Sequence, residues 1–137
     1  MKNLILAIAA AVVPSLGFAA ATPYDGVRLL NDCKAAVRIL DQGKTTSKAD
    51  EAVAATQCSY FSWGVYLAQR GAVTKTGQRL FCAPGNATQE QVVRVIEKWL
   101  TEHPEQLHLA AERLIPTALR DAFPCPPTTR RKDEQAT

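Results

Sequence analysis

Apolar residues recur at helical spacing in four segments of the chain, and the clearest two lie between Phe81 and Cys125. Thr88 can serve as the N-cap of the first of these two, because Gln91 follows at the position that completes a capping box. Five apolar residues then form one stripe: Val92, Val95, Ile96, Trp99 and Leu100. The pattern predicts an amphipathic helix that ends before Pro104.

The segment that follows predicts another helix with a matching stripe. Pro104 is suited to its first position, where no backbone donor is needed. The stripe comprises Leu107, Ala111, Leu114 and Ala118, with Ala110 and Leu119 widening it. Pro116 should kink this helix, because it lacks a backbone N–H and its ring clashes with the preceding turn. Two stripes joined by a tight turn predict an antiparallel helical hairpin, with Cys82 and Cys125 together at its open end.

The N-terminal half predicts a similar pair of helices. The first runs from about Tyr24 to Asp41 and ends at Gly43, since glycine readily adopts the left-handed conformation that terminates helices. Its apolar face comprises Leu30, Cys33, Val37 and Leu40. Ser47 can cap the next helix, which ends at Gly71. Its apolar face comprises Ala54, Cys58, Phe61, Val65 and Ala68.

Facing stripes in this first hairpin bring Cys33 and Cys58 within reach of each other. Of the three pairings that four cysteines allow, we therefore expect Cys33–Cys58 and Cys82–Cys125. Gly64 interrupts the second helix, and we expect that its small size lets another helix pack closely. The sequence thus predicts an all-α fold, a small bundle of about four helices in two helical hairpins, stapled by two disulfides.

Residues 1–21 have the features of a cleaved signal peptide. Lys2 precedes an apolar run, and small residues follow it at the position that a signal peptidase prefers. The run is shorter than the ~20 residues that a membrane span needs. We expect a helical domain over residues 22–125 and a disordered polar tail over residues 126–137. Export to an oxidising compartment explains four paired cysteines.

Candidate chemistry for catalysis or metal binding is sparse. Cysteines that pair leave no free thiol, and no serine lies in a nucleophile-elbow motif. The cysteines form no C-x-x-C motif, and neither His103 nor His108 is near a cysteine in sequence, which argues against a zinc site. The net charge of +3 comes from interspersed acids and bases rather than a basic face for nucleic acid. We expect a binding protein without a cofactor, and not an enzyme.

Two features are candidates for partner contact. The long connection from Ala72 to Asn86 carries Lys75 and Arg79, and long connections often carry function, although this one could be a plain crossover between hairpins. Three aromatic residues share one side of the second helix: Tyr60, Trp63 and Tyr66. They could belong to the core or form an exposed contact face, since tyrosine and tryptophan are enriched at interfaces.

Two stretches resemble a known family. The frame FCAPGNATQEQVVRVIEKWLTEHPEQLH…AL…AFPC, together with the upstream CSYFSWGV and Cys33, is similar to the Rap/Tai family of periplasmic immunity proteins. The resemblance covers nearly the whole mature chain. It implies a small helical protein with disulfides, often a homodimer, that protects a bacterium from peptidoglycan amidases delivered by type VI secretion. Members bind the amidase and block its active-site cleft, partly with a protruding loop.

The resemblance favours steric inhibition of an effector amidase, with the Lys75–Arg79 loop and the three aromatic residues as candidate contacts. One of these two surfaces could instead be a dimer interface. An alternative function is that of a small periplasmic acid-stress chaperone, which would release apolar surface when its carboxylates are protonated. Unfolding and client binding below about pH 3 would distinguish this alternative.

Overall fold

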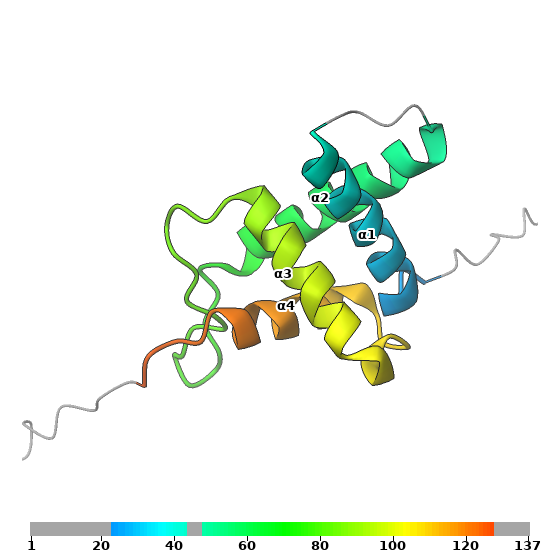
Figure 1. Ribbon diagram of the computed structural model, residues 1–137. Helices are drawn as coiled ribbons and strands as arrows, with labels where there is room; N and C mark the ends of the chain where they lie inside the picture. The colour runs from blue at the N-terminus through cyan, green and yellow to red at the C-terminus, as the bar shows by residue number, and fades with distance from the viewer. Residues whose placement is uncertain (1–22, 44–47, 128–137) are drawn as a thin grey trace, which may run out of the picture.

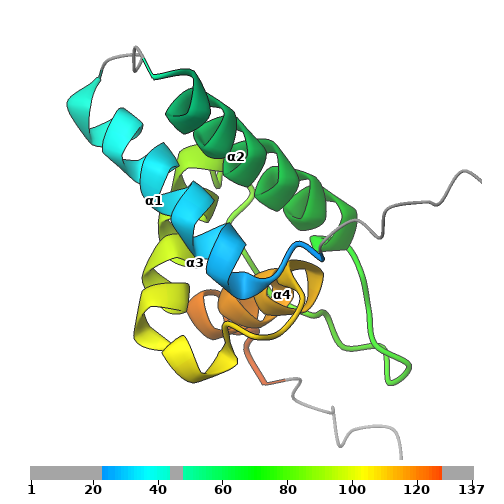
Figure 2. The same ribbon diagram turned by 90° about the vertical axis from the view of Figure 1, so that its right-hand side faces the viewer.

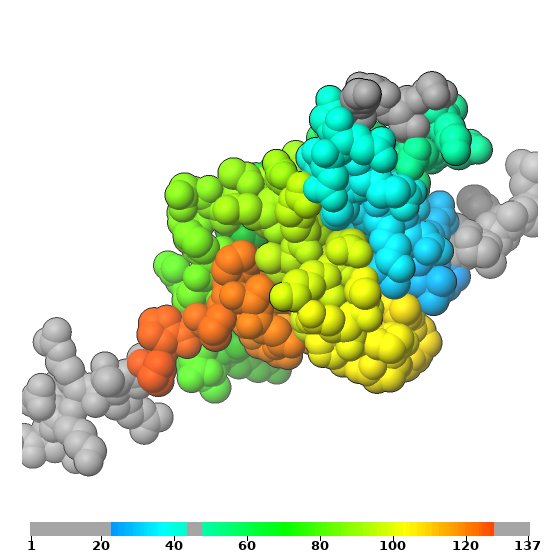
Figure 3. Space-filling view, viewed as in Figure 1, coloured from blue at the N-terminus to red at the C-terminus, as the bar shows by residue number. Residues whose placement is uncertain are grey.

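The computed structural model describes residues 23–43 and 48–127, and it is all-helical. Its elements in order are α1 (Gly26–Gln42), α2 (Ala49–Gln69), α3 (Gln89–Glu102), the short 3₁₀ helix η1 (Pro104–Gln106) and α4 (Ala111–Ala122). The helices α1 and α2 pack side by side (Figure 2), while α4 lies across α3 in both ribbon views (Figures 1 and 2). Figure 3 shows the surface of α4 between that of α3 and that of the segment joining α2 to α3. The predicted four-helix architecture is confirmed.

The core lies where the four helices meet. Its largest fully buried side chains are Phe81, Leu29, Ile96, Leu100, Leu114, Ile115 and Leu119. The α3 stripe is buried largely as predicted, with Val93 added to it. The predicted stripe of α1 extends too far, because Leu40 is 37% exposed where the helix runs beyond the bundle. Ala68, predicted on the apolar face of α2, is also exposed.

The predicted helix ends are confirmed where local side-chain chemistry determines them. The Thr88 hydroxyl accepts from the Gln91 N–H (3.2 Å), and the Gln91 side chain accepts from the Thr88 N–H (3.0 Å), which completes the capping box. Gly43 ends α1 in the left-handed conformation at φ 58°. Ser47, the predicted cap of α2, lies outside the described residues, and the N-cap position of α2 is Lys48.

The start of the last helix was predicted wrongly. Pro104 begins only η1, and α4 starts at Ala111. The reason is a tertiary contact: the Gly26 N–H donates to the Leu109 carbonyl (2.9 Å), and the Ala111 N–H donates to the Tyr24 carbonyl (2.9 Å). These bonds to the chain at the start of α1 replace the bonds of a longer helix. Pro116 consequently lies in the second turn of α4, which continues through it to Ala122.

Gly64 was also interpreted wrongly. A Cβ atom at this position would meet nothing within 4 Å, so no helix of this chain packs against it. The buried face of α2 is instead formed by Ala55, Cys58, Ser62 and Tyr66. Because α2 has no charged residue between Glu51 and Arg70, its sequence pattern does not distinguish an inner from an outer face.

Tyr24 ties the start of the domain to both α1 and α2. Its hydroxyl donates to Asp32 Oδ2 (2.8 Å), and its ring packs edge-to-face on Phe61 with centroids 5.1 Å apart. Burial raises the pKa of Tyr24 above its ordinary value, and the hydrogen bond to Asp32 and the charge of Asp32 raise it further. The Tyr24 hydroxyl therefore remains a donor in the folded protein at pH values where a free tyrosine ionises.

We expect Tyr24→Phe to lower the free energy of unfolding at pH 8 by about 1–3 kcal/mol, because the buried Asp32 carboxylate loses a donor. The difference should shrink as the pH rises above about 10, where Tyr24 ionises in the unfolded chain but stays protonated in the folded one. The stability that the Tyr24–Asp32 hydrogen bond contributes is thus fully present below about pH 10 and decreases progressively as the pH rises above it. Urea unfolding of both proteins from pH 8 to pH 11 tests this, and a constant difference would contradict it.

Candidate functional site

Two disulfides hold the scaffold, with the predicted connectivity. Cys33–Cys58 joins α1 to α2 with a Cα–Cα distance of 5.1 Å, and both residues are fully buried. Cys82–Cys125 joins the segment after α2 to the chain just beyond α4, with a Cα–Cα distance of 4.8 Å. The first bridge thus lies in the core, and the second lies at the edge of the molecule, next to the long connection.

The long connection contains an exposed loop, residues 73–79, which we call the projecting loop. It extends away from the helices in both ribbon views (Figures 1 and 2), and all seven of its residues are exposed. The loop closes on itself: Val73 and Arg79 form an antiparallel bridge, and the Thr74 N–H donates to the Gln78 carbonyl (2.7 Å). Gly77 adopts a φ of 78°, which a tight turn requires and glycine supplies. Sequence reasoning missed this closure, although the glycine in TKTGQ was a signal for it.

The base of the projecting loop is anchored at several points. The Leu80 N–H donates to the Ala72 carbonyl (3.3 Å), and the Cys82 N–H donates to the Phe123 carbonyl (2.9 Å). Phe81 is 1% exposed and inserts into the core. The Arg79 carbonyl oxygen lies 3.9 Å from Cys125 Sγ. The loop therefore stands on a fixed base beside the second disulfide.

The loop and the chain that flanks it carry only basic charges. The sequence has no acidic residue between Glu51 and Glu90, but it has Arg70, Lys75 and Arg79. Within the described part of the chain, none of these three bases forms an ion pair with an acidic side chain. Arg70 was not among the predicted contacts, and the acid-free stretch was the signal that could have identified it.

The three predicted aromatic contacts do not form one exposed face. Tyr66 is 2% exposed, because its ring stacks between Trp63 (4.8 Å) and Phe81 (5.7 Å) in the core. Its interpretation as part of an exposed contact face was therefore wrong. Trp63 is half-buried, and only Tyr60, at 71% exposed, presents its ring to solvent. Tyr60 lies apart from the projecting loop, which begins beyond the end of α2.

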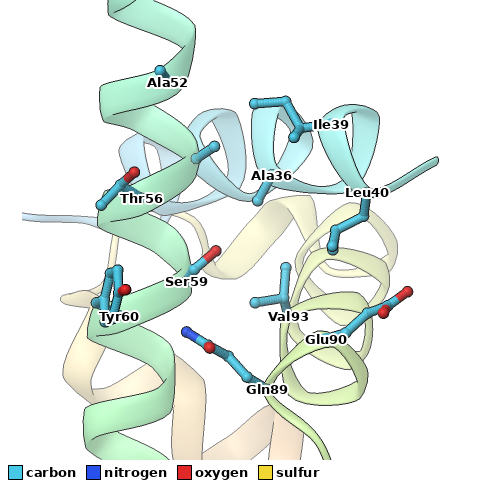
Figure 4. Close-up of a pocket in the computed structure, with 11 residues that line it drawn as sticks. Ala36, Ile39, Leu40, Ala52, Thr56, Ser59, Tyr60, Gln89, Glu90 and Val93 are labelled. Atoms are coloured by element: carbon cyan, nitrogen blue, oxygen red, sulfur yellow. The ribbon is translucent and has the colours of Figure 1, made fainter. Parts of the chain in front are cut away.

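A groove of about 380 Å³ lies beside Tyr60. Figure 4 shows its walls: α2 on one side, and α1 with the start of α3 on the other. Ala36, Ile39 and Val93 make its floor largely apolar, and Glu90 lies at its edge. Tyr60 also belongs to an exposed apolar stripe of α2, which we call the α2 seam: Val53, Tyr60 and Leu67, seven residues apart and 64%, 71% and 45% exposed.

The histidines have structural roles. The His103 ring stacks on Trp99 with centroids 4.1 Å apart, and Trp99 Nε1–H donates to Asp121 Oδ2 (2.9 Å). His108 Nδ1 lies 3.0 Å from the Glu105 carbonyl oxygen. Within residues 23–43 and 48–127, no three His, Cys, Asp or Glu side chains come together as a metal site. The same residues include no helix with the length and hydropathy needed to cross a membrane.

Comparison with known proteins places the chain in a family. The family model of the Rap1a immunity proteins matches residues 25–125, which is most of the chain, so the chain belongs to this family. The family is non-enzymatic, and membership implies that the protein confers immunity against a secreted effector. No curated protein and no solved structure matches the chain.

Proposed function

We propose that this member of the Rap1a immunity proteins binds a peptidoglycan amidase delivered by type VI secretion and blocks its active-site cleft. The observation that carries the proposal is the projecting loop, whose residues are all exposed, which is closed by its own hydrogen bonds and whose charged side chains are basic. The family resemblance supports the assignment to an amidase, because it implies proteins that block an amidase cleft partly with a protruding loop. The Lys75–Arg79 part of the loop is the proposed contact.

The anchoring of the loop fits inhibition by steric blocking. An inhibitor that enters a catalytic cleft loses less conformational entropy on binding when its contact segment is already ordered. The Val73–Arg79 bridge and the Thr74–Gln78 hydrogen bond order the loop, and the nearby Cys82–Cys125 disulfide ties down its base. The partner must therefore accept one shape, which gives specificity without catalysis.

We propose that the protein acts in the periplasm. Two disulfides fit an exported protein, because such bonds persist in oxidising compartments. The proposed signal peptide, residues 1–21, and most of the proposed tail, residues 126–137, lie outside the described residues. Peptidoglycan also lies in the periplasm, so an amidase delivered there would meet this protein at its site of action.

Binding and inhibition measurements test the proposed function. The oxidised mature chain, residues 22–137, would be mixed with purified candidate amidases and assayed by gel filtration and by peptidoglycan cleavage. We expect co-elution with one amidase and loss of its activity at a stoichiometric amount of inhibitor. A correctly folded protein that binds none of the amidases and protects cells from none of them would refute the proposal.

We also propose that the α2 seam mediates a homodimer. Its three large apolar side chains lie on the exposed face of α2, at a spacing of two helical turns, as in helices that pair along a seam. Gly64 lies on the same outer side with open space around it, which would let a second helix approach closely. The family resemblance, in which homodimers are frequent, supports a second copy as the occupant.

We expect Tyr60→Asp to convert the dimer to a monomer, because a charge at the centre of the seam would be buried without a partner. Val27→Asp is the matched control, since Val27 is an exposed valine on α1 away from the seam. Sedimentation equilibrium measures the mass of each variant. An unchanged dimer mass for Tyr60→Asp would exclude the seam, and a monomeric wild type would exclude the dimer.

A further inference from the structure

We propose that a pocket at the base of the projecting loop binds an aspartate or glutamate carboxylate of the partner, between Arg70 and Arg79. The identification of the partner rests on the proposed function above, while the carboxylate chemistry rests on the pocket alone. The pocket has a volume of about 360 Å³ and is bounded by the end of α2 and by the segment that follows the loop.

The last turn of α2 and the end of the projecting loop place the two arginines that line the pocket. Tyr66 and Arg70 are four residues apart at the end of α2, so they lie on one face of the helix. Arg79 is the last residue of the loop, and its backbone is held by the bridge to Val73. Phe81 closes the pocket on the core side. Both arginines therefore border one cavity from two different elements.

The pocket offers donors and no acidic acceptor. None of the residues that line it is aspartate or glutamate, and neither arginine has an acidic partner among the described residues. Arginine presents a planar fork of N–H donors that matches a carboxylate. The carboxyl end of α2 carries a partial negative charge that disfavours an anion, and the two full positive charges outweigh it.

The Tyr66 hydroxyl is the second observation that points to a ligand. The residue is 2% exposed, yet its hydroxyl has no hydrogen-bond partner within the described residues. No side-chain nitrogen or oxygen of these residues is both buried and unpaired. The hydroxyl therefore keeps some contact with solvent, and because Tyr66 lines the pocket, we infer that its hydroxyl is free to donate to an oxygen bound there.

The position of the pocket favours a protein partner over a free anion. A protein that receives the loop in a cleft brings the rim of that cleft against the base of the loop, where Arg70 and Arg79 lie. The loop and the chain on either side of it, from residue 52 to residue 89, carry basic side chains and no acidic one. A carboxylate on the rim would thus be attracted over a distance and then held at the pocket.

The first experiment measures the pocket without any partner. The ¹⁵N-labelled protein would be titrated with acetyl-Gly-Glu-Gly-amide and, as a control, with acetyl-Gly-Gln-Gly-amide, while the arginine Nε–Hε signals are followed by NMR. We expect saturable shifts at Arg70 and Arg79 with the glutamate peptide only. Arg70→Gln should abolish them, and Arg113→Gln, at an exposed arginine of α4, should not. Absent shifts, or equal shifts with the glutamine peptide, would overturn the proposal.

The second experiment measures the same variants against an amidase that the wild type binds. We expect Arg70→Gln to weaken the complex by about tenfold and to reduce the dependence of affinity on salt, with Arg113→Gln unchanged. An unchanged affinity for the amidase would overturn the assignment of the pocket to the partner. The same conclusion would follow if Arg70→Gln weakened binding of cell-wall stem peptides, which also carry carboxylates, and did not weaken binding of the amidase. If no amidase binds, the proposed function fails, and the peptide titration still decides whether the pocket takes a carboxylate.

Discussion

Replacing residues 74–78 with an Asn-Gly turn will abolish inhibition of the amidase and leave the helical fold intact. Val73 and Arg79 already form an antiparallel bridge, so a two-residue turn can join them without disturbing the base of the loop. The removed residues are all exposed and contribute nothing to the core. If the loop fills the cleft, its loss should weaken binding on the order of 100-fold or more. Calorimetry and the peptidoglycan cleavage assay measure this effect.

The charge on the loop should matter separately from its shape. Lys75→Glu keeps the loop but reverses a charge at its tip, and it should slow association with an acidic partner by about tenfold at low salt. Lys34→Glu makes the same change at an exposed position of α1 and should have little effect.

Full inhibition by the variant in which an Asn-Gly turn replaces residues 74–78, with an unchanged far-UV circular dichroism spectrum, would show that another surface blocks the enzyme.

The parts of the fold that could be predicted from sequence are those that local chemistry determines. The capping box at Thr88 needs only residues three apart, and the amphipathic stripe of α3 is unambiguous because charged residues interrupt it regularly. The start of α4 could not be predicted in this way. It depends on backbone hydrogen bonds from residues 24 and 26 to residues 109 and 111, which lie far away in sequence.

The candidate site likewise combines features that the local sequence predicts with features that only tertiary packing determines. Lys75 and Arg79 were located from composition and loop length, since both signals are local. The burial of Tyr66 was not predictable, because it depends on Phe81, which approaches from beyond the loop. The uncharged sequence of α2 also offered several equivalent faces, and only packing against α1 and α3 selects the buried one. Residues with the same local pattern, Tyr60 and Tyr66, therefore have opposite environments.

Removing the two disulfides one at a time should show that both stabilise the fold and that only Cys82–Cys125 contributes to inhibition. Their sequence separations are 25 and 43 residues, so each Cys→Ala pair should lower the free energy of unfolding by about 3–4 kcal/mol through the entropy of the unfolded chain. Inhibition should respond differently. The Cys33→Ala/Cys58→Ala protein retains an anchored loop and should inhibit like the wild type while it is folded.

The Cys82→Ala/Cys125→Ala protein should lose about tenfold in affinity, because the base of the loop keeps only hydrogen bonds to the end of α4 and the loop must be ordered further on binding. Urea unfolding measures stability, and calorimetry at 15 °C, where both variants are expected to be folded, measures affinity. Equal affinities for the two variants would show that the hydrogen bonds within the loop suffice to order it. Weaker binding by the Cys33→Ala/Cys58→Ala protein would instead place the contact surface on the α1–α2 hairpin, away from the projecting loop.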